Sequence, residues 1–272
     1  MKTFTESYKH YIHTVSGTTS EFGFDLERVA QIEPFLSLLH RSWWHVQFDG
    51  LEHLNKTGPA LIVGNNGGVL PWPALMLMYT LMSSKANPRR LNIMANLDWV
   101  ENERLYKALT DIGFVPWSST NAKKLFSAGE LIAIFPEGYA GATKRFAERY
   151  RLREFDWTQL LPAVEQSVPI YPLATLGCDE ILPVFDNLEP LARLLGLPAY
   201  PITPFFPWLP FPANLLTLPV RWRMHLLQPV VCQPGCDRDT LENTASREAY
   251  FIQGGIQSEL NRLLRARIKN HK

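Results

Sequence analysis

Two short apolar runs of this chain, at 60–63 and 131–135, each lead into a stretch of polar residues. Short apolar runs are typical of buried parallel strands, and functional loops lie at the carboxyl ends of such strands. We therefore expect the side chains that follow the two runs to converge on one cleft; they are Asn65, Asn66, Glu137 and Lys144. An Asn amide has no titratable proton near neutral pH, so Asn66 can offer hydrogen bonds but cannot act as a general base.

A third apolar run, at 168–176, ends in the residues LGCDE. The Cys178 thiol could accept an acyl group, although a small buried packing residue is the interpretation that we favour. Asp179 and Glu180 could act as bases at the same strand end. The histidines that precede the first run are expected elsewhere on the fold, at the surface or the edge of the core; they are His40, His45 and His53.

Composition argues against several classes of function. Lys and Arg total 27 against 26 for Asp and Glu, and a phosphate backbone requires a basic surface, so we expect no nucleic-acid partner. The absence of a GxSxG elbow, a P-loop and a GxGxxG fingerprint argues against a hydrolase or a nucleotide-binding protein. Cys232 and Cys236 could be a metal or redox pair, but no second Cys/His pair stands at zinc-ligand spacing. We therefore expect incidental thiols, no metal and no cofactor.

The order of elements predicts the fold class. Short apolar runs alternate with helical patterns, which is typical of an α/β protein, and 46% hydrophobic residues suffice for a large core. We predict a mostly parallel central sheet flanked by helices, with an N-terminal helical segment and a C-terminal helix. The expected domains are an N-terminal helical extension, 1–40, and a single larger domain, 41–272. The larger domain includes an apolar loop, 194–220, and the C-terminal helix, 240–270.

The loop sequences, read in order, resemble one known family. They are GPALIVGNNGGVLPWPALML, GELIAIFPEGYAGATKRF, RYRLREF and VPIYPLATLGCDE. Together they resemble the glycerol-phosphate and lysophospholipid acyltransferase superfamily over about residues 40 to 235, and FPEG at 135–138 is the sharpest element. The resemblance implies the glycerolipid acyltransferase fold and two substrates. The acyl donor would be acyl-CoA or acyl carrier protein, and the acceptor a lysophospholipid or another lipid.

The resemblance also implies a mechanism whose central residues are replaced here. In the family a His takes the proton of the acceptor hydroxyl and an Asp fixes the His tautomer. Asn66 stands at the His position, Pro73 at the Asp position, and Ala140 where an Arg is common. Proline has no side-chain acceptor. The remaining family positions imply substrate binding; they are Asn65, Glu137, Gly138, Thr143 and Lys144.

Two hypotheses follow from these replacements. One is a non-catalytic or strongly altered member that binds acyl thioester or glycerolipid and supports an active paralogue or pathway partner. The other is an active acyltransferase with a rebuilt site, in which Asn66 polarises the thioester and another base, or the substrate itself, takes the proton.

The apolar loop and the C-terminal helix suggest a membrane surface as a further partner. Residues 194–220 carry no charge, and the proline density excludes a spanning helix. The aromatic side chains of this loop are Tyr200, Phe205, Phe206, Trp208 and Phe211. We expect an irregular loop that either binds a membrane or folds back over the core. The C-terminal helix should carry Leu260, Leu263, Leu264 and Ile268 on one side, and its basic last turns complement the helix dipole or contact anionic lipid. With no targeting segment visible, we expect a cytoplasmic protein with peripheral membrane association.

Overall fold

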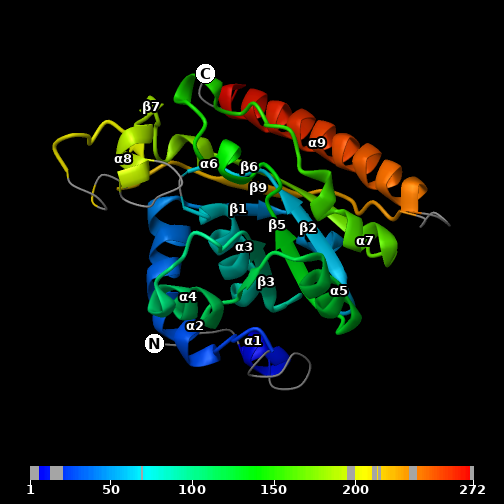
Figure 1. Cartoon of the computed structure of the whole chain (residues 1–272). Coiled ribbons are helices and arrows are strands. Elements are labelled where there is room, and N and C mark those ends of the chain that lie inside the picture. Colours follow the sequence, from blue (N-terminus) through cyan, green and yellow to red (C-terminus); the bar gives the residue numbers. More distant parts are fainter. Residues whose placement is uncertain are drawn as a thin grey trace.

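The computed structural model describes residues 6–12, 21–68, 70–194, 200–209, 213, 216–232 and 238–269. A seven-stranded sheet lies at the centre, and helices cover both of its faces (Figure 1). Of the predicted fold, the mostly parallel sheet and the flanking helices are confirmed, since β6 with β9 is the single antiparallel pairing in this sheet. The strands in spatial order are β1 (Gln47–Asp49), β9 (Arg223–Leu226), β6 (Ile170–Leu176), β2 (Ala60–Gly64), β5 (Leu131–Ile134), β3 (Leu91–Ala95) and β4 (Phe114–Pro116).

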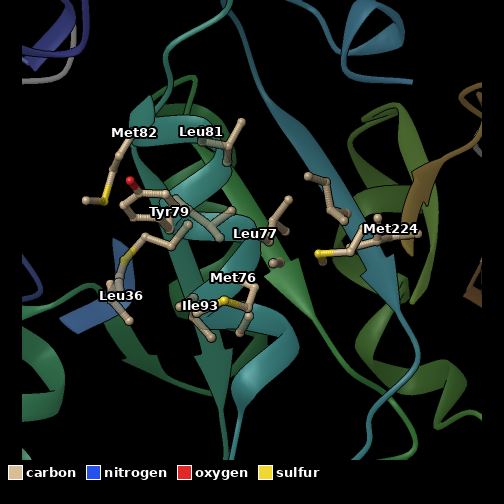
Figure 2. Close-up of a cluster of buried hydrophobic side chains, with 14 of the residues drawn as sticks. Leu36, Met76, Leu77, Tyr79, Leu81, Met82, Ile93 and Met224 are labelled. Atoms are coloured by element: carbon tan, nitrogen blue, oxygen red, sulfur yellow. The ribbon is translucent and has the colours of Figure 1, made fainter. Parts of the chain in front are cut away.

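One face of the sheet packs against α2 (Leu26–Ser37) and α3 (Trp72–Ser83). Asp25 begins α2 because its side chain accepts from the backbone N–H of Glu27 at 2.8 Å, as an N-cap residue does. Met76 and Met82 point from α3 into this core (Figure 2), and both are almost fully buried. The methionines of α3 therefore serve packing, where their flexible side chains fill irregular gaps.

The opposite face packs against α5 (Ser119–Ser127), α7 (Leu161–Glu165) and the long helix α9 (Arg238–Lys269), which crosses that face in Figure 1. Successive strand residues point to opposite faces, and the two clusters divide accordingly: Ile62 faces α3, whereas Leu61 faces α7 and α9. Leu260 and Leu263 of α9 are buried in the core, whereas Ile268, at the margin of the same side, is 54% exposed. Eight residues turn a helix about 80° beyond two full turns, which carries position 268 off the buried stripe of Leu260.

The N-terminal residues join the same core as α2. Tyr8 and Ile12, in and just after α1 (Glu6–Tyr11), are buried in the cluster that contains α3. The expected boundary at residue 40 falls within η2 (Leu38–Trp43), so side chains on both sides of it share one core. The division into 1–40 and 41–272 stays a prediction.

The remaining elements of the described chain are short. They are η3 (Leu51–His53), α4 (Glu103–Asp111), α6 (Gly138–Ala142), η4 (Phe146–Glu148), η5 (Trp157–Gln159), η6 (Cys178–Glu180), β7 (Asp186–Asn187), α8 (Glu189–Leu194) and β8 (Pro201–Ile202). Within the apolar loop Tyr200 is buried and Trp208 is 84% exposed, while Phe211 lies outside the described residues. None of the helices in the described ranges is long and apolar enough to cross a membrane.

Candidate functional site

The candidate site lies where three adjacent strands end. β2 pairs in parallel with β5 on one side and β6 on the other, so the loops that follow all three meet at one edge of the sheet. The backbone N–H of Asn66, after β2, donates to Oε1 of Glu137, after β5, at 2.9 Å. Lys144 Nζ lies 3.3 Å from the other oxygen of Glu137. The structure thus brings together Asn66, Glu137 and Lys144, as expected from the strand order.

Glu137 is a buried acceptor rather than an exposed ligand. Its side chain has no exposed surface, and Oε2 accepts from the backbone N–H of Arg153 at 2.8 Å. A Cβ at Gly141 would lie 2.5 Å from Cβ of Glu137, so only glycine at 141 lets the FPEG turn close over this side chain. Burial raises the pKa of Glu137, although Lys144 and the two backbone donors oppose the shift.

Lys144 lies between two buried carboxylates. Its Nζ is 3.4 Å from Oδ1 of Asp179, and both side chains are at most 5% exposed. Asp179 Oδ2 accepts from the backbone N–H of Tyr150 at 2.8 Å. Burial lowers the pKa of Lys144, but Asp179 and Glu137 outweigh it and the pKa is raised overall. Burial also raises the pKa of Asp179 despite Lys144. We call Glu137, Lys144 and Asp179 the buried charge cluster; with all three ionised its net charge is −1.

Asn65 joins the ends of β2 and β6. Its Oδ1 accepts from the backbone N–H of Thr175 at 2.7 Å, and its Nδ2 donates to the carbonyl of Thr175 at 3.0 Å. The side-chain amide therefore continues the strand pairing for one more residue after the backbone of β2 has turned away. At 1% exposure, Asn65 is a structural link beneath the loop.

Cys178 lies directly beside Asn65 and is fully buried. Its Sγ is 3.2 Å from the carbonyl of Thr175, and burial raises the pKa of the thiol well above its ordinary value. A Cβ at Gly67 would lie 2.7 Å from this sulfur, so the glycine of GNNGG permits the close contact. A protonated and inaccessible thiol is a poor acyl acceptor, and the geometry favours packing.

Asn66 and its neighbours are nearer the surface. The half-buried Asn66 side chain donates from Nδ2 to the carbonyl of the exposed Gly138 at 3.3 Å. Thr143 Oγ1 donates to the carbonyl of Tyr139 at 2.7 Å. Pro73 is buried at the start of α3, where its missing N–H leaves no helical hydrogen bond unmade.

His40, His45 and His53 form no hydrogen bond with the Asn66 loop among the contacts of the described residues. His40 Nε2 lies 3.1 Å from Thr80 Oγ1, and burial with the Arg41 charge lowers the pKa of His40 to about 4. His53 Nδ1 lies 3.0 Å from the carbonyl of Leu226, at the opposite edge of the sheet from the candidate site. His45 has a positive φ of 46° just before β1. In the described part of the chain, His, Cys, Asp and Glu side chains form no group that could hold a metal ion.

Sequence reasoning missed the segment 150–155 as part of this site. Its backbone supplies the N–H groups of Tyr150 and Arg153 to the buried charge cluster, and its partners on α9 are Gln253 and Gln257. Backbone donors leave no residue-type pattern, so the motif RYRLREF gave no sign of this role. Arg149, the residue before this segment, packs over the Phe146 ring at 4.4 Å and donates to the Phe146 carbonyl.

Comparisons with known proteins bear on the family and the fold of this chain. The family model described as Acyltransferase matches residues 45–176. An uncharacterized protein of Mycobacterium leprae is 36% identical over 253 residues, which cover 92% of this chain and 69% of that protein. An uncharacterized protein of Mycobacterium tuberculosis is 35% identical over the same length and shares 70% of its own chain. The crystal structure of the 1-acyl-sn-glycerophosphate (LPA) acyltransferase PlsC from Thermotoga maritima has a similar fold. Its TM-score is 0.54 at 13% identity, covering 87% of this chain and 80% of that one.

Proposed function

Since the chain belongs to the acyltransferase superfamily, we propose that it binds an acyl thioester and a lysophospholipid-type lipid at the Asn66 loop without the general base of an acyltransferase. It is then a non-catalytic or strongly altered member of the family. The acyl donor is acyl-CoA or acyl carrier protein, and an active paralogue or a pathway partner would complete the chemistry. The proposed acceptor class follows from the family and from the name of the Thermotoga protein, which has the same fold.

One observation carries the proposal: the titratable side chains packed against the Asn66 loop cannot exchange protons with a substrate. Glu137, Lys144 and Asp179 are buried and bonded to one another, and the adjacent Cys178 thiol is buried and protonated. No histidine occurs in the loop sequence between Gly64 and Pro73. General-base catalysis is worth about 10²–10⁴-fold, so its loss should leave turnover very slow.

The proposed substrate-binding residues divide into two groups by burial. Asn66, Gly138 and Thr143 are half-buried or exposed and are proposed to meet substrate. Asn65, Glu137 and Lys144 are proposed to act from beneath by fixing the loops. Arg149 is exposed beside the loops and close enough to lower the pKa of Asp179. Its guanidinium is held by Phe146 and suits the phosphate of an acyl donor or of a lipid head group.

The alternative is an active acyltransferase with a rebuilt site. It would use the Asn66 amide to polarise the thioester carbonyl, and another base or the substrate itself would take the proton. The half-exposed position of Asn66 supports this alternative, because the side chain is close enough to the surface to meet a substrate.

Turnover and binding, measured together, separate the two readings. The protein is incubated with palmitoyl-CoA and lysophosphatidic acid, thiol release is followed, and palmitoyl-CoA binding is measured by calorimetry. We expect saturable binding with thiol release close to the protein-free rate. Thiol release at ordinary enzyme rates, about 1–10³ per second, supports the alternative. A protein that neither binds palmitoyl-CoA nor releases thiol would overturn the proposal. Asn66→Ala serves as the matched site variant and should weaken binding without unfolding the protein.

Membrane association is the second part of the proposal, and exposed apolar side chains support it. Those in or before the apolar loop, 194–220, are Phe185, Leu194, Trp208 and Leu216, each at least 57% exposed. Trp43, 39% exposed, donates from Nε1 to the carbonyl of Thr217, which connects this loop to η2. Leu70 of the Asn66 loop is 40% exposed. Apolar surface beside a lipid-binding loop suits a peripheral protein that takes its substrate from a bilayer.

A further inference from the structure

We infer that the C-terminal helix α9 positions the Asn66 loop, through two glutamines that hold the segment 150–155. The positioning follows from contacts in the described chain. Its consequence for ligand affinity rests on the proposed function. The residues involved are Gln253 and Gln257, and neither belongs to the sequence motifs of the family resemblance.

The first link joins α9 to the segment. Gln257 Nε2 donates to the carbonyl of Tyr150 at 2.7 Å, and Gln257 Oε1 accepts from the N–H of Leu152 at 3.0 Å. Gln253, one turn earlier on the same helix face, accepts from the N–H of Phe155 at 3.2 Å. The Gln257 amide thus bonds a backbone carbonyl and a backbone N–H two residues apart, as the backbone of a neighbouring strand would. The segment needs such partners, since residues 151–156 belong to no helix or strand.

The second link joins the segment to the buried charge cluster. The N–H of Tyr150 donates to Asp179, and the N–H of Arg153 donates to Glu137, each at 2.8 Å. The segment therefore uses some of its N–H groups toward α9 and others toward the carboxylates. Tyr150 has a φ of 66°, a left-handed conformation that is unfavourable for a residue with a side chain. The bond from Gln257 to its carbonyl helps to offset that cost.

The third link joins the cluster to the Asn66 loop. Glu137 accepts from Arg153 with one oxygen and from the N–H of Asn66 with the other. Gln257 is thus connected to Asn66 through the backbone of 150–153 and a single carboxylate. Arg267, near the end of α9, adds a second attachment because it bonds Glu180 and, at 3.2 Å, the hydroxyl of Tyr150. A shift of the segment would move the Glu137 carboxylate and with it the Asn66 N–H.

The test is the backbone amide resonance of Asn66 in labelled full-length protein. An N–H bonded to a carboxylate has a distinct proton shift, and Gln257→Leu should move it toward the value of a weaker bond. Asn243→Leu is the matched control, since Asn243 is an exposed amide on the same helix. Gln257→Glu keeps the acceptor for Leu152 and should restore part of the parent shift. An Asn66 resonance unchanged in folded Gln257→Leu would overturn the inference.

Two further measurements keep the outcome decisive. If Gln257→Leu does not fold, Gln253→Leu is measured instead. This variant removes only the acceptor for the Phe155 N–H, and we expect a smaller change in the Asn66 amide shift. Palmitoyl-CoA affinity should fall about 10-fold in Gln257→Leu and stay within about 2-fold in Asn243→Leu. Should the unmodified protein bind no palmitoyl-CoA, the proposed function fails, while the amide resonance still decides whether α9 positions the loop.

Discussion

The backbone N–H of Asn66 donates to the buried carboxylate of Glu137 across 71 positions of sequence. This bond connects the loop after β2 with the turn after β5, so the position that we predict to correspond to the family histidine is fixed by the glutamate of FPEG. In this chain Glu137 accepts hydrogen bonds from backbone N–H groups of the site. Its carboxylate is fully engaged by Asn66, Arg153 and Lys144.

Glu137→Gln should destabilise the protein although it changes few atoms. The amide has one acceptor oxygen for two backbone donors, and Lys144 loses one of its two carboxylates. Removing one partner of a buried pair is costly, and we expect about 3 kcal/mol in urea unfolding. Glu148→Gln is the matched control, because Glu148 pairs with Arg153 at about 40% exposure and should cost about 0–1 kcal/mol. Equal costs for the two variants would contradict this account of the cluster.

The buried charge cluster predicts how stability depends on pH. Glu137 and Asp179 have pKa values raised above 4.5 and 3.8 in the folded state, so the folded protein binds protons more tightly than the unfolded chain. Their contribution is present at acid pH and is lost as pH rises through the raised values. The pKa of Lys144 is raised above 10.5, and its contribution is present below that pH and lost above it. Urea unfolding from pH 4 to 8 should therefore show the parent's advantage over Glu137→Gln shrinking as pH rises. An advantage that grows with pH would show that the Glu137 pKa is lowered.

Asn65→Ala should cost more stability than an ordinary amide deletion. It leaves the N–H of Thr175 buried without its partner and the Thr175 carbonyl with only the weak Cys178 thiol donor, and an orphaned buried group costs about 1–3 kcal/mol. Asn65→Asp should be worse, because a carboxylate cannot donate to the carbonyl and its charge would be buried. Thermal unfolding checks both, with Asn121→Ala as the control. Asn121 makes a single side-chain bond, to the Pro116 carbonyl at 3.0 Å.

Trp208→Ser should weaken vesicle binding without unfolding the protein. Trp208 is 84% exposed, and burying such a side chain in a bilayer contributes roughly 1.5–3 kcal/mol, or about 10- to 100-fold in affinity. Tyr250→Ser is the matched control, since Tyr250 is 81% exposed on α9. The measurement is sedimentation with phosphatidylcholine vesicles, repeated with an anionic lipid. A parent protein that stays in the supernatant with both vesicles would disprove the membrane proposal.

The strands that frame the site could be predicted from the sequence, and several of their side-chain roles could not. β2, β5 and β6 are continuous apolar runs, so their burial and the meeting of Asn66 with Glu137 followed from residue types alone. The burial of Glu137 and Lys144 depends on Gly141 and on backbone donors from 150–153, which share no pattern with one another. Tyr8 and Ile12 lie where the sequence shows no helical periodicity, so their place in the core was not apparent. Spacing along α9 placed Ile268 on the same side as Leu260, but it lies about 80° around the helix from Leu260 and is exposed, so a shared side did not predict burial.

The edge strand β1 constrains the order in which the sheet can form during synthesis. Within the described part of the chain, β1 (residues 47–49) pairs with β9 (residues 223–226) and with no other strand, and Trp44 stacks on Trp222 at 4.8 Å beside that pairing. A chain emerging from the ribosome can assemble β2 to β6 while β1 still has no neighbour. The N-terminal strand and the tryptophan before it must wait for almost the whole chain to be made. Such long-range closure is slow and exposes apolar surface meanwhile, so nascent chains halted before residue 223 should depend most on chaperones.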